Sequence, residues 1–223
     1  MKTILLLIGI SLFFLSCHKQ KLVTIVHYNV INNGVGGNKS SDLLERISEV
    51  YQNKPDLVII MIGTNDALSK SDSLSTYASN LEKIDSLFKL HHIKVLFLSP
   101  PPHGIVAIPS PIDDLNQKID AETGLMDSIS TNNGNYYFDM HTAFIAQGTP
   151  NATVSSLIRN PANNPSKPDG THPTIQGYHF IAQQVYNVLK SNGLLTCTTI
   201  SCFGDSITAA EYPNFLSVLL NGS

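Results

Sequence analysis

Three residues carry side chains that together could activate a nucleophile: Ser206, His172 and Asp169. A serine hydroxyl is a weak nucleophile until a neighbouring base takes its proton, and the base works best when a third group fixes its tautomer. Asp169 and His172 are three residues apart in a glycine-containing turn that ends in Pro173. This short spacing can place the carboxylate beside the imidazole, so the three residue types predict acyl transfer through an acyl-serine intermediate.

A tetrahedral acyl intermediate also needs hydrogen-bond donors for its oxyanion, and each donor is typically worth about 10²- to 10³-fold in rate. The candidate donors are the backbone N–H groups of Ser206 and Gly37 and the side-chain amide of Asn65. The glycine-rich stretch around Gly37 could instead cradle a phosphate, but it lacks both the Gly-x-Gly-x-x-Gly spacing and a Lys-Ser or Lys-Thr ending. Asp66 is predicted to cap, in part, the helix that follows it.

Five short runs rich in β-branched and aromatic residues predict the strands that must position these groups. They are residues 22–30, 57–62, 94–98, 136–140 and 199–203. Apolar residues recur with helical spacing between them, around 43–50, 81–88 and 178–189. Alternating strands and helices predict a five-stranded parallel sheet with helices on both faces, a three-layer α/β/α sandwich of the flavodoxin-like kind.

Ligands bind beyond the carboxyl ends of the strands in an open parallel sheet. Four unusual stretches directly follow predicted strands: residues 32–38, 63–66, 100–103 and 204–208. They are therefore expected at one edge of the sheet. The proline-rich stretch 99–169 is predicted to be the least regular part of the chain and to form surface loops that shape a pocket.

Four blocks of the sequence resemble those of the SGNH hydrolases, also called the GDSL family of esterases and lipases. They are Gly36-Gly37-Asn38 within residues 32–42, Gly63-Thr64-Asn65-Asp66, Asp169-Gly170-Thr171-His172-Pro173 and Phe203-Gly204-Asp205-Ser206-Ile207-Thr208. The resemblance implies that Ser206 is the nucleophile, His172 the base and Asp169 the acid that orients it. It also implies oxyanion donors at Ser206, Gly37 and Asn65. The absence of a Gly-x-Ser-x-Gly elbow around Ser206 argues against an α/β-hydrolase.

The order of the blocks departs from the family, because the serine block normally opens the domain and here closes it. A circular permutation explains this order. Residues 212–220 are predicted to form the helix that follows the nucleophile, and the C-terminal residues 221–223 would lead into the first strand. Permutation is tolerated where chain termini lie close together, and a triad is defined by geometry rather than by chain order.

Composition limits the classes of partner. The 223 residues are 42% apolar and 14% charged, which suits one globular domain over residues 18–223. The net charge is −3, and the 14 lysines and arginines form no basic stripe, so nucleic acid is not an expected partner. The remaining histidines lack metal-ligand spacing, and we expect neither a metal nor a cofactor. A monomer is expected.

The first 17 residues predict export. Lys2 precedes an apolar run over residues 4–15, which is too short to cross a bilayer and resembles the core of a signal peptide. Phe14-Leu15-Ser16-Cys17 resembles a bacterial lipobox, which implies a lipidated Cys17 and a periplasmic or cell-surface lipoprotein whose only membrane contact is this anchor. Ordinary cleavage without an anchor is the alternative.

Several residues are predicted to be structural rather than catalytic. Cys197 and Cys202 would lie about 16 Å apart along an extended strand, beyond disulfide reach, which favours two small buried residues. Asp139 and His141 are predicted to share a strand face, and Asp205 to serve as a structural hydrogen-bonding group. His103, which follows three prolines, could line the pocket.

The family resemblance implies hydrolysis of short-chain esters, and export of the protein favours acetyl groups on polysaccharides such as acetylated xylan. Lysophospholipids and thioesters are alternative substrates. Two further hypotheses stay open, a non-catalytic lipoprotein that binds glycans and an O-acyltransferase that uses the same triad.

Overall fold

The computed structural model describes residues 26–105, 112–149 and 151–222. The predicted signal segment, with Cys17, and the first residues of the predicted strand 22–30 lie outside the described residues. Five strands form one parallel sheet in the order β1-β5-β2-β3-β4. Their bounds are β1 Asn29–Gly34, β2 Leu57–Met61, β3 Lys94–Leu98, β4 Tyr136–Phe138 and β5 Thr199–Gly204.

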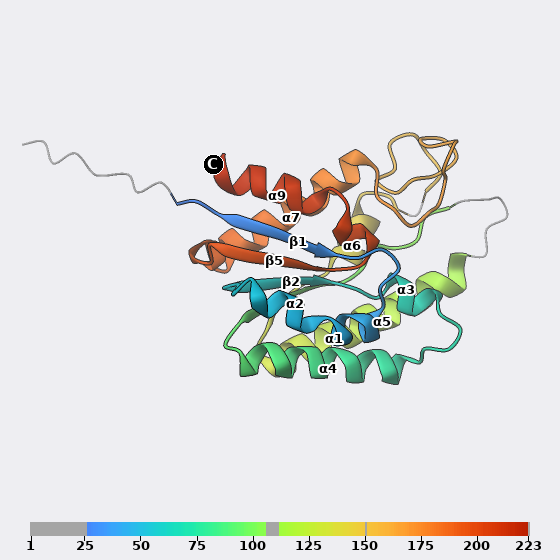
Figure 1. Cartoon of the computed structure of the whole chain (residues 1–223). Coiled ribbons are helices and arrows are strands. Elements are labelled where there is room, and N and C mark those ends of the chain that lie inside the picture. The colour runs from blue at the N-terminus through green and yellow to red at the C-terminus, as the bar shows by residue number, and fades with distance from the viewer. Residues whose placement is uncertain (1–25, 106–111, 150, 223) are drawn as a thin grey trace, which may run out of the picture.

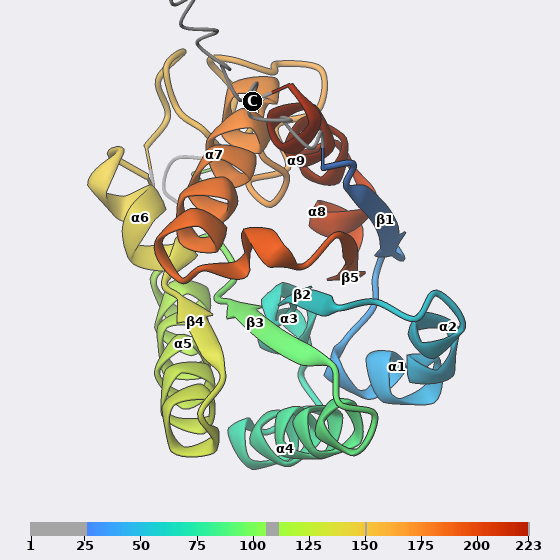
Figure 2. The same ribbon diagram turned by 90° about the vertical axis from the view of Figure 1, so that its left-hand side faces the viewer.

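Helices cover both faces of the sheet, which confirms the predicted three-layer sandwich (Figures 1 and 2). One face packs against α6 (Met140–Ala146), α7 (Ile175–Ser191) and α9 (Tyr212–Asn221). The other packs against α1 (Ser40–Glu45), α2 (Ile47–Gln52), α4 (Leu74–Leu90) and α5 (Ile112–Asn133). The short α3 (Thr64–Leu68), α8 (Ser206–Ala209) and the 3₁₀ turn η1 (Leu194–Thr196) complete the described elements.

Strand β2 shows why the sheet needs two helical layers. Leu57, Ile59 and Met61 point into the core under α7 and α9, whereas Val58 and Ile60 point into the core above α4. All five side chains are at most 1% exposed. A strand buried on both faces has an unbroken apolar sequence, and this is why its position was predictable.

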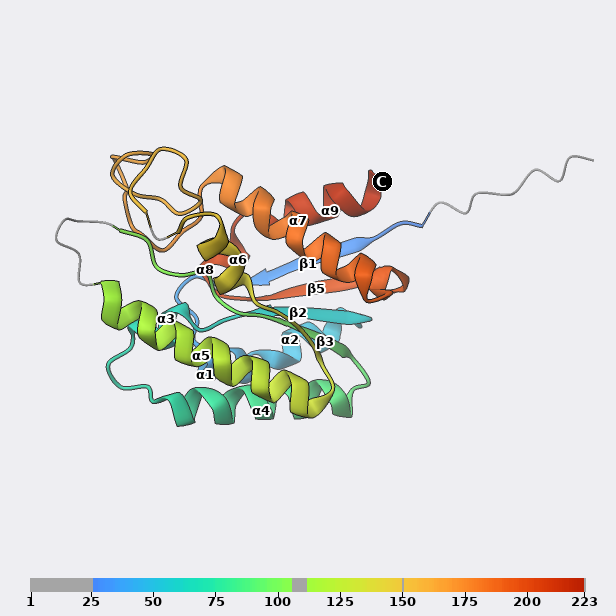
Figure 3. The same cartoon turned by 180° about the vertical axis from the view of Figure 1, so that it is seen from behind.

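The prediction that residues 99–169 form surface loops is wrong in the middle of that stretch, where α5 runs for 22 residues beside α4 (Figure 3). The prolines lie before and after this helix. Its buried face carries Ile119, Met126 and Ile129, but Glu122 and Ser130 lie on the same face and are buried as well. These polar residues interrupt the apolar spacing that would have indicated a helix.

Two strand predictions need correction at their ends. Within the described residues, strand β1 begins at Asn29, so residues 26–28 of the predicted strand are not part of it, and it continues to Gly34; strand β4 ends at Phe138. Asp139 terminates β4 because its carboxylate caps α6, accepting hydrogen bonds from Thr142 N at 2.8 Å and Thr142 Oγ1 at 2.6 Å. Asp139 and His141 therefore do not share a strand face; His141 is buried in α6.

The start of β1 lies against the end of α9. Tyr28 N donates to Asn221 Oδ1 at 2.9 Å, and Asn221 Nδ2 donates back to Tyr28 O at 3.1 Å. Counting β5 as the first strand turns the observed order into 2-1-3-4-5, the flavodoxin-like order. Both features agree with the predicted circular permutation.

Cys197 and Cys202 are buried and free, as the strand geometry predicts. Within the described part of the chain, no helix has the length and apolar character needed to cross a bilayer.

A chain that ends at Thr198 should not fold, because β5 is hydrogen-bonded to both β1 and β2. The deletion removes Ile200, Cys202 and Phe203, all fully buried. Burial of one large apolar side chain is worth about 1.5–3 kcal/mol, and a domain has only about 5–15 kcal/mol of stability in total. We expect insoluble protein or loss of the cooperative thermal transition, measured by circular dichroism. Ser206→Ala, which removes no strand, is the control; a truncated chain with an intact transition would contradict this topology.

Candidate active site

Ser206 lies at the turn from β5 to α8, at the carboxyl end of a strand that has a neighbour on each side. Gly204 ends the strand in a space that admits no side chain, since a Cβ atom there would lie 2.3 Å from Met61 O and from Thr208 Oγ1. Asp205 then caps α8, and its carboxylate accepts a hydrogen bond from Ile207 N at 2.8 Å. This confirms the structural role predicted for Asp205. Burial raises the pKa of this carboxyl to about 7.

Ser206, His172 and Asp169 form a continuous chain of hydrogen bonds. His172 Nε2 is 3.0 Å from Ser206 Oγ, and His172 Nδ1 is 2.8 Å from Asp169 Oδ2. A carboxylate at Nδ1 favours the tautomer that carries its proton there, which leaves Nε2 free to accept the proton of the serine hydroxyl. The structure thus brings together the three side chains predicted from the sequence, in the geometry of a Ser-His-Asp triad.

The Asp169 carboxylate is kept ionised by its hydrogen bonds. Burial favours the neutral acid, but Asp169 Oδ1 accepts from His172 N at 2.8 Å and from Thr171 N at 3.0 Å, in addition to the imidazole at Oδ2. These bonds outweigh the burial and hold the pKa of the carboxyl below its usual value. The negative charge is therefore available to orient the imidazole and to stabilise it when it is protonated.

The turn that carries Asp169 and His172 is fixed by backbone bonds to two other loops. Arg159 N donates to His172 O at 3.0 Å, and Gly170 N donates to Arg159 O at 3.1 Å. Gly104 N donates to Gly170 O at 2.7 Å. Arg159 also places Nη1 3.6 Å from Asp169 Oδ2. Sequence reasoning missed Arg159, because a single basic residue in a polar loop gives no signal of what it contacts.

The glycine loop lies against Ser206. Gly37 has a φ of 80°, a left-handed conformation that favours glycine, and a Cβ atom on Gly36 would lie 3.9 Å from Ser206 Cβ. Asn65, in the first turn of α3, donates its side-chain amide to Asn38 O at 2.9 Å. The two blocks that carry the predicted oxyanion donors Gly37 and Asn65 are thus joined to each other beside the serine.

Arg46 holds the glycine loop to the end of β5. Its Nε donates to Asn38 Oδ1 at 2.5 Å and its Nη2 donates to Gly204 O at 2.9 Å, while the guanidinium lies 4.6 Å from the ring centroid of Phe203. This arginine between α1 and α2 was also missed from the sequence. It sits in a helical segment, where a charged residue ordinarily faces solvent.

Asp66 does not cap α3 as predicted. Its carboxylate instead accepts hydrogen bonds from Ser40 N at 3.0 Å and from Ser40 Oγ at 2.5 Å, at the start of α1. The backbone N–H groups of α3 receive no side-chain cap. Burial raises the pKa of the Asp66 carboxyl. Asp66 therefore links the asparagine block to the helix that follows the glycine block.

Glu122 of α5 lies directly beneath the asparagine block. Gly63 has a φ of 139°, and a Cβ atom there would lie 2.8 Å from Glu122 Oε2. Glu122 is 3% exposed, and its Oε2 has no hydrogen-bond partner among the described residues. Burial, with a smaller contribution from Asp66, raises the pKa of this carboxyl to about 9. Glu122 is consequently neutral at neutral pH.

His103 is half-buried beside the triad turn. Its Nδ1 is 2.9 Å from Gly104 O, and the Asn116 amide bonds both backbone groups of His103, so the loop after β3 is held to α5. The described residues include no group of three or more His, Cys, Asp or Glu side chains that could hold a metal ion.

The sequence matches the GDSL-like lipase/acylhydrolase family over residues 17–180. The chain belongs to this family. The matched stretch contains Gly37, Asn65, Asp169 and His172 and ends before Ser206, which agrees with a serine block that has moved to the end of the chain. This GDSL-type protein is a hydrolase that cleaves esters.

Solved structures share its fold at low sequence identity. A GDSL-like lipase from Bacteroides thetaiotaomicron is 23% identical with a TM-score of 0.57, over 72% of this chain and 75% of the other. A protein described as a putative acylhydrolase from Bacteroides fragilis is 23% identical with a TM-score of 0.56, over 72% and 74%. A mutant of Axe2, an acetyl-xylooligosaccharide esterase from Geobacillus stearothermophilus, is 21% identical with a TM-score of 0.55, over 69% and 68%. No curated protein matches the sequence significantly.

Asn65→Ala should lower kcat about 10²-fold, because one amide donor to the oxyanion is lost. The melting temperature should fall only by the few degrees expected for one hydrogen bond worth about 1 kcal/mol, the bond to Asn38 O. Asn192→Ala is the matched control, since it removes an amide-to-carbonyl bond of the same 2.9 Å length at the far end of α7. Unchanged turnover in Asn65→Ala would remove this residue from the oxyanion site.

Glu122→Gln should stabilise the protein at alkaline pH. The carboxyl ionises near pH 4.5 when unfolded and near pH 9 when folded, so the native state binds more protons between these values and wild-type stability falls as the pH rises through this range. The amide side chain of the variant does not ionise, so the stability of the variant does not fall in this way as the pH rises. The melting temperatures of the two proteins should therefore be close at pH 4 and diverge in favour of Glu122→Gln up to pH 9. The exposed Glu82→Gln controls for removal of a carboxylate; a pH-independent difference would contradict the burial of a neutral acid.

Proposed function

We propose that this GDSL hydrolase is a serine esterase that removes short acyl groups, acetyl in particular, from polysaccharides such as acetylated xylan, and that it acts as a monomer. The observation that carries the catalytic assignment is the unbroken chain from Ser206 Oγ through His172 to Asp169, with contacts of 3.0 and 2.8 Å.

In the proposed acylation step, Ser206 Oγ attacks the ester carbonyl carbon while His172 Nε2 takes the hydroxyl proton. The oxyanion that forms accepts hydrogen bonds from the N–H groups of Ser206 and Gly37 and from the Asn65 amide. The imidazolium then protonates the leaving alcohol oxygen, the carbon–oxygen bond breaks, and the acyl group remains on Ser206. Asp169 stays ionised throughout and stabilises the positive imidazolium.

Deacylation repeats these steps with water. His172 Nε2 takes a proton from water as the water oxygen attacks the acyl carbon, and the imidazolium returns a proton to Ser206 Oγ as the free acid leaves. The chemistry requires neither a metal nor a redox cofactor, because the imidazole carries every proton that moves between the serine, the leaving alcohol and water.

The polysaccharide substrate is supported by analogy with the acetyl-xylooligosaccharide esterase that shares the fold. Lysophospholipids and thioesters are alternative substrates within the same chemistry. A glycan-binding protein without activity would have no need of a serine hydroxyl hydrogen-bonded to an oriented imidazole, and this disfavours the non-catalytic alternative.

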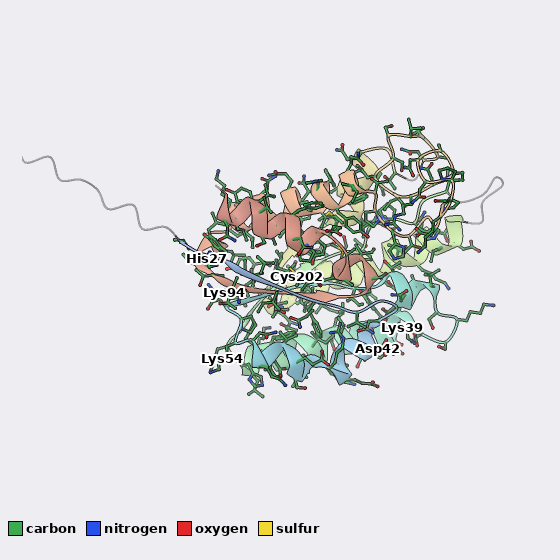
Figure 4. All side chains as sticks on the ribbon, turned by 45° about the horizontal axis from the view of Figure 1, so that its top comes forward. His27, Lys39, Asp42, Lys54, Lys94 and Cys202 are labelled. Atoms are coloured by element: carbon green, nitrogen blue, oxygen red, sulfur yellow. The ribbon has the colours of Figure 1, made fainter. Side chains whose placement is uncertain are left out.

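We also propose that the protein is exported and anchored through a lipid on Cys17. Strand β1 starts at the opposite end of the sheet from Ser206, because the strands are parallel and Ser206 follows the carboxyl end of β5 (Figure 1). His27, Lys54 and Lys94 lie at the end where β1 starts (Figure 4). An anchor that precedes β1 would thus join the domain at the end of the sheet opposite the candidate active site.

A fluorophosphonate probe tests the nucleophile. Wild-type protein should be labelled once, and Ser206→Ala should lose both the label and the release of nitrophenol from nitrophenyl acetate. Ser128→Ala, on the exposed side of α5, is the control and should behave as wild type. Nitrophenyl esters of increasing chain length and acetylated xylan then define the acyl group and the alcohol. Folded wild-type protein that takes no label would support the binding protein instead, and acyl transfer to an added sugar acceptor would identify an acyltransferase.

A further inference from the structure

A cavity of about 560 Å³ opens beside the turn that carries Asp169 and His172. Its walls come from residues 154–164 and from the start of α7, and they include Val154, Arg159, Asn164, Ile175 and Gln176. The triad chemistry described above uses none of these side chains.

The lining is a mixture of polar and apolar side chains with one charge. Arg159 is the only charged residue among those that line the cavity within the described chain. Asn164 Oδ1 accepts from Ser166 Oγ at 3.1 Å, whereas its Nδ2 and the whole amide of Gln176 have no partner among the residues that the structure describes. Val154 and Ile175 are 77% and 55% exposed and add apolar surface. Free amides, a guanidinium and small apolar patches suit the hydroxyl-rich ring of a sugar.

The guanidinium of Arg159 has N–H donors that are available to a ligand. Its Nη1 lies 3.6 Å from Asp169 Oδ2, beyond good hydrogen-bond length, and that oxygen already accepts from His172 Nδ1 at 2.8 Å. A guanidinium has five N–H donors in a planar fork that matches a carboxylate in two parallel hydrogen bonds. The backbone of Arg159 is meanwhile hydrogen-bonded to the triad turn, so its side chain starts from a fixed point beside that turn.

The cavity is close enough to the serine for one substrate to reach both. Consecutive contacts of 3.6, 2.8 and 3.0 Å lead from Arg159 through Asp169 and His172 to Ser206 Oγ. An oligosaccharide with its acetyl group at Ser206 is long enough to span this separation, whereas a small ester is not.

We propose that this cavity is a subsite for the sugar portion of the substrate and that Arg159 selects an acidic sugar, a uronic acid whose carboxylate pairs with the guanidinium. This inference rests on the proposed esterase function and narrows its substrate class to acetylated polysaccharides with uronic acid side groups. The pair is partly exposed, so the preference is modest and weakens with salt.

The test compares two acetylated xylo-oligosaccharides that differ only in one side group, a glucuronic acid or its carboxyl-reduced glucose counterpart. The value of kcat/KM for acetate release should be about three- to tenfold higher for the acidic one with wild-type protein at low salt. Gln176→Glu adds a negative charge to the cavity without touching Asp169. It should abolish or reverse the ratio, because the added carboxylate repels a uronate and competes for the guanidinium of Arg159.

Gln183→Glu is the matched control, because the same change is made on an exposed position of the same helix outside the cavity. It should keep the wild-type ratio. Equal rates for the two oligosaccharides, or an equal fall of the ratio in both variants, would overturn the subsite while Ser206 labelling and nitrophenyl acetate hydrolysis persisted. Absence of labelling and of all ester hydrolysis would overturn the proposed function together with the subsite.

Discussion

The position of β5 between β1 and β2 is the constraint on which the candidate site depends. The register sets Gly204 level with Gly34 on one neighbour and with Met61 on the other, so three parallel strands end at the same height. The turn with Ser206, the glycine loop and the asparagine block follow directly from these three ends. Val35 N and Arg46 Nη2 both donate to Gly204 O, which fastens the glycine loop to the strand that carries the serine.

Several acidic side chains are buried below this edge of the sheet. The hydrogen bonds that each carboxyl group accepts decide whether its pKa is raised or lowered. Asp205, Asp66 and Glu122 all have raised pKa values because burial dominates, and the shift is large for Glu122, whose Oε2 has no partner among the described residues. The pKa of Asp169 is instead lowered, because its hydrogen bonds stabilise the carboxylate more than burial destabilises it. Of these four carboxyl groups, the one whose ionised form is favoured by its hydrogen bonds is the one that contacts the imidazole.

Much of the site could be predicted, because short motifs fix local geometry. The strands at residues 57–61 and 94–98 follow from apolar runs, and the spacing of Asp169 and His172 fixes their contact. The long helix α5 could not be predicted, because buried polar residues break its pattern. Arg46 and Arg159 were missed for another reason: each acts through contacts between loops that are distant in sequence, and only the fold brings them together.

The place of β5 in the chain has a consequence for protein synthesis. β5 lies between β1 and β2 but leaves the ribosome after both of them, so these two strands are made without their shared neighbour. Ser206 follows β5, so a nascent chain that has not reached this strand carries neither the nucleophile nor the strand that positions it. Ester cleavage thus begins only after the other four strands have been synthesised.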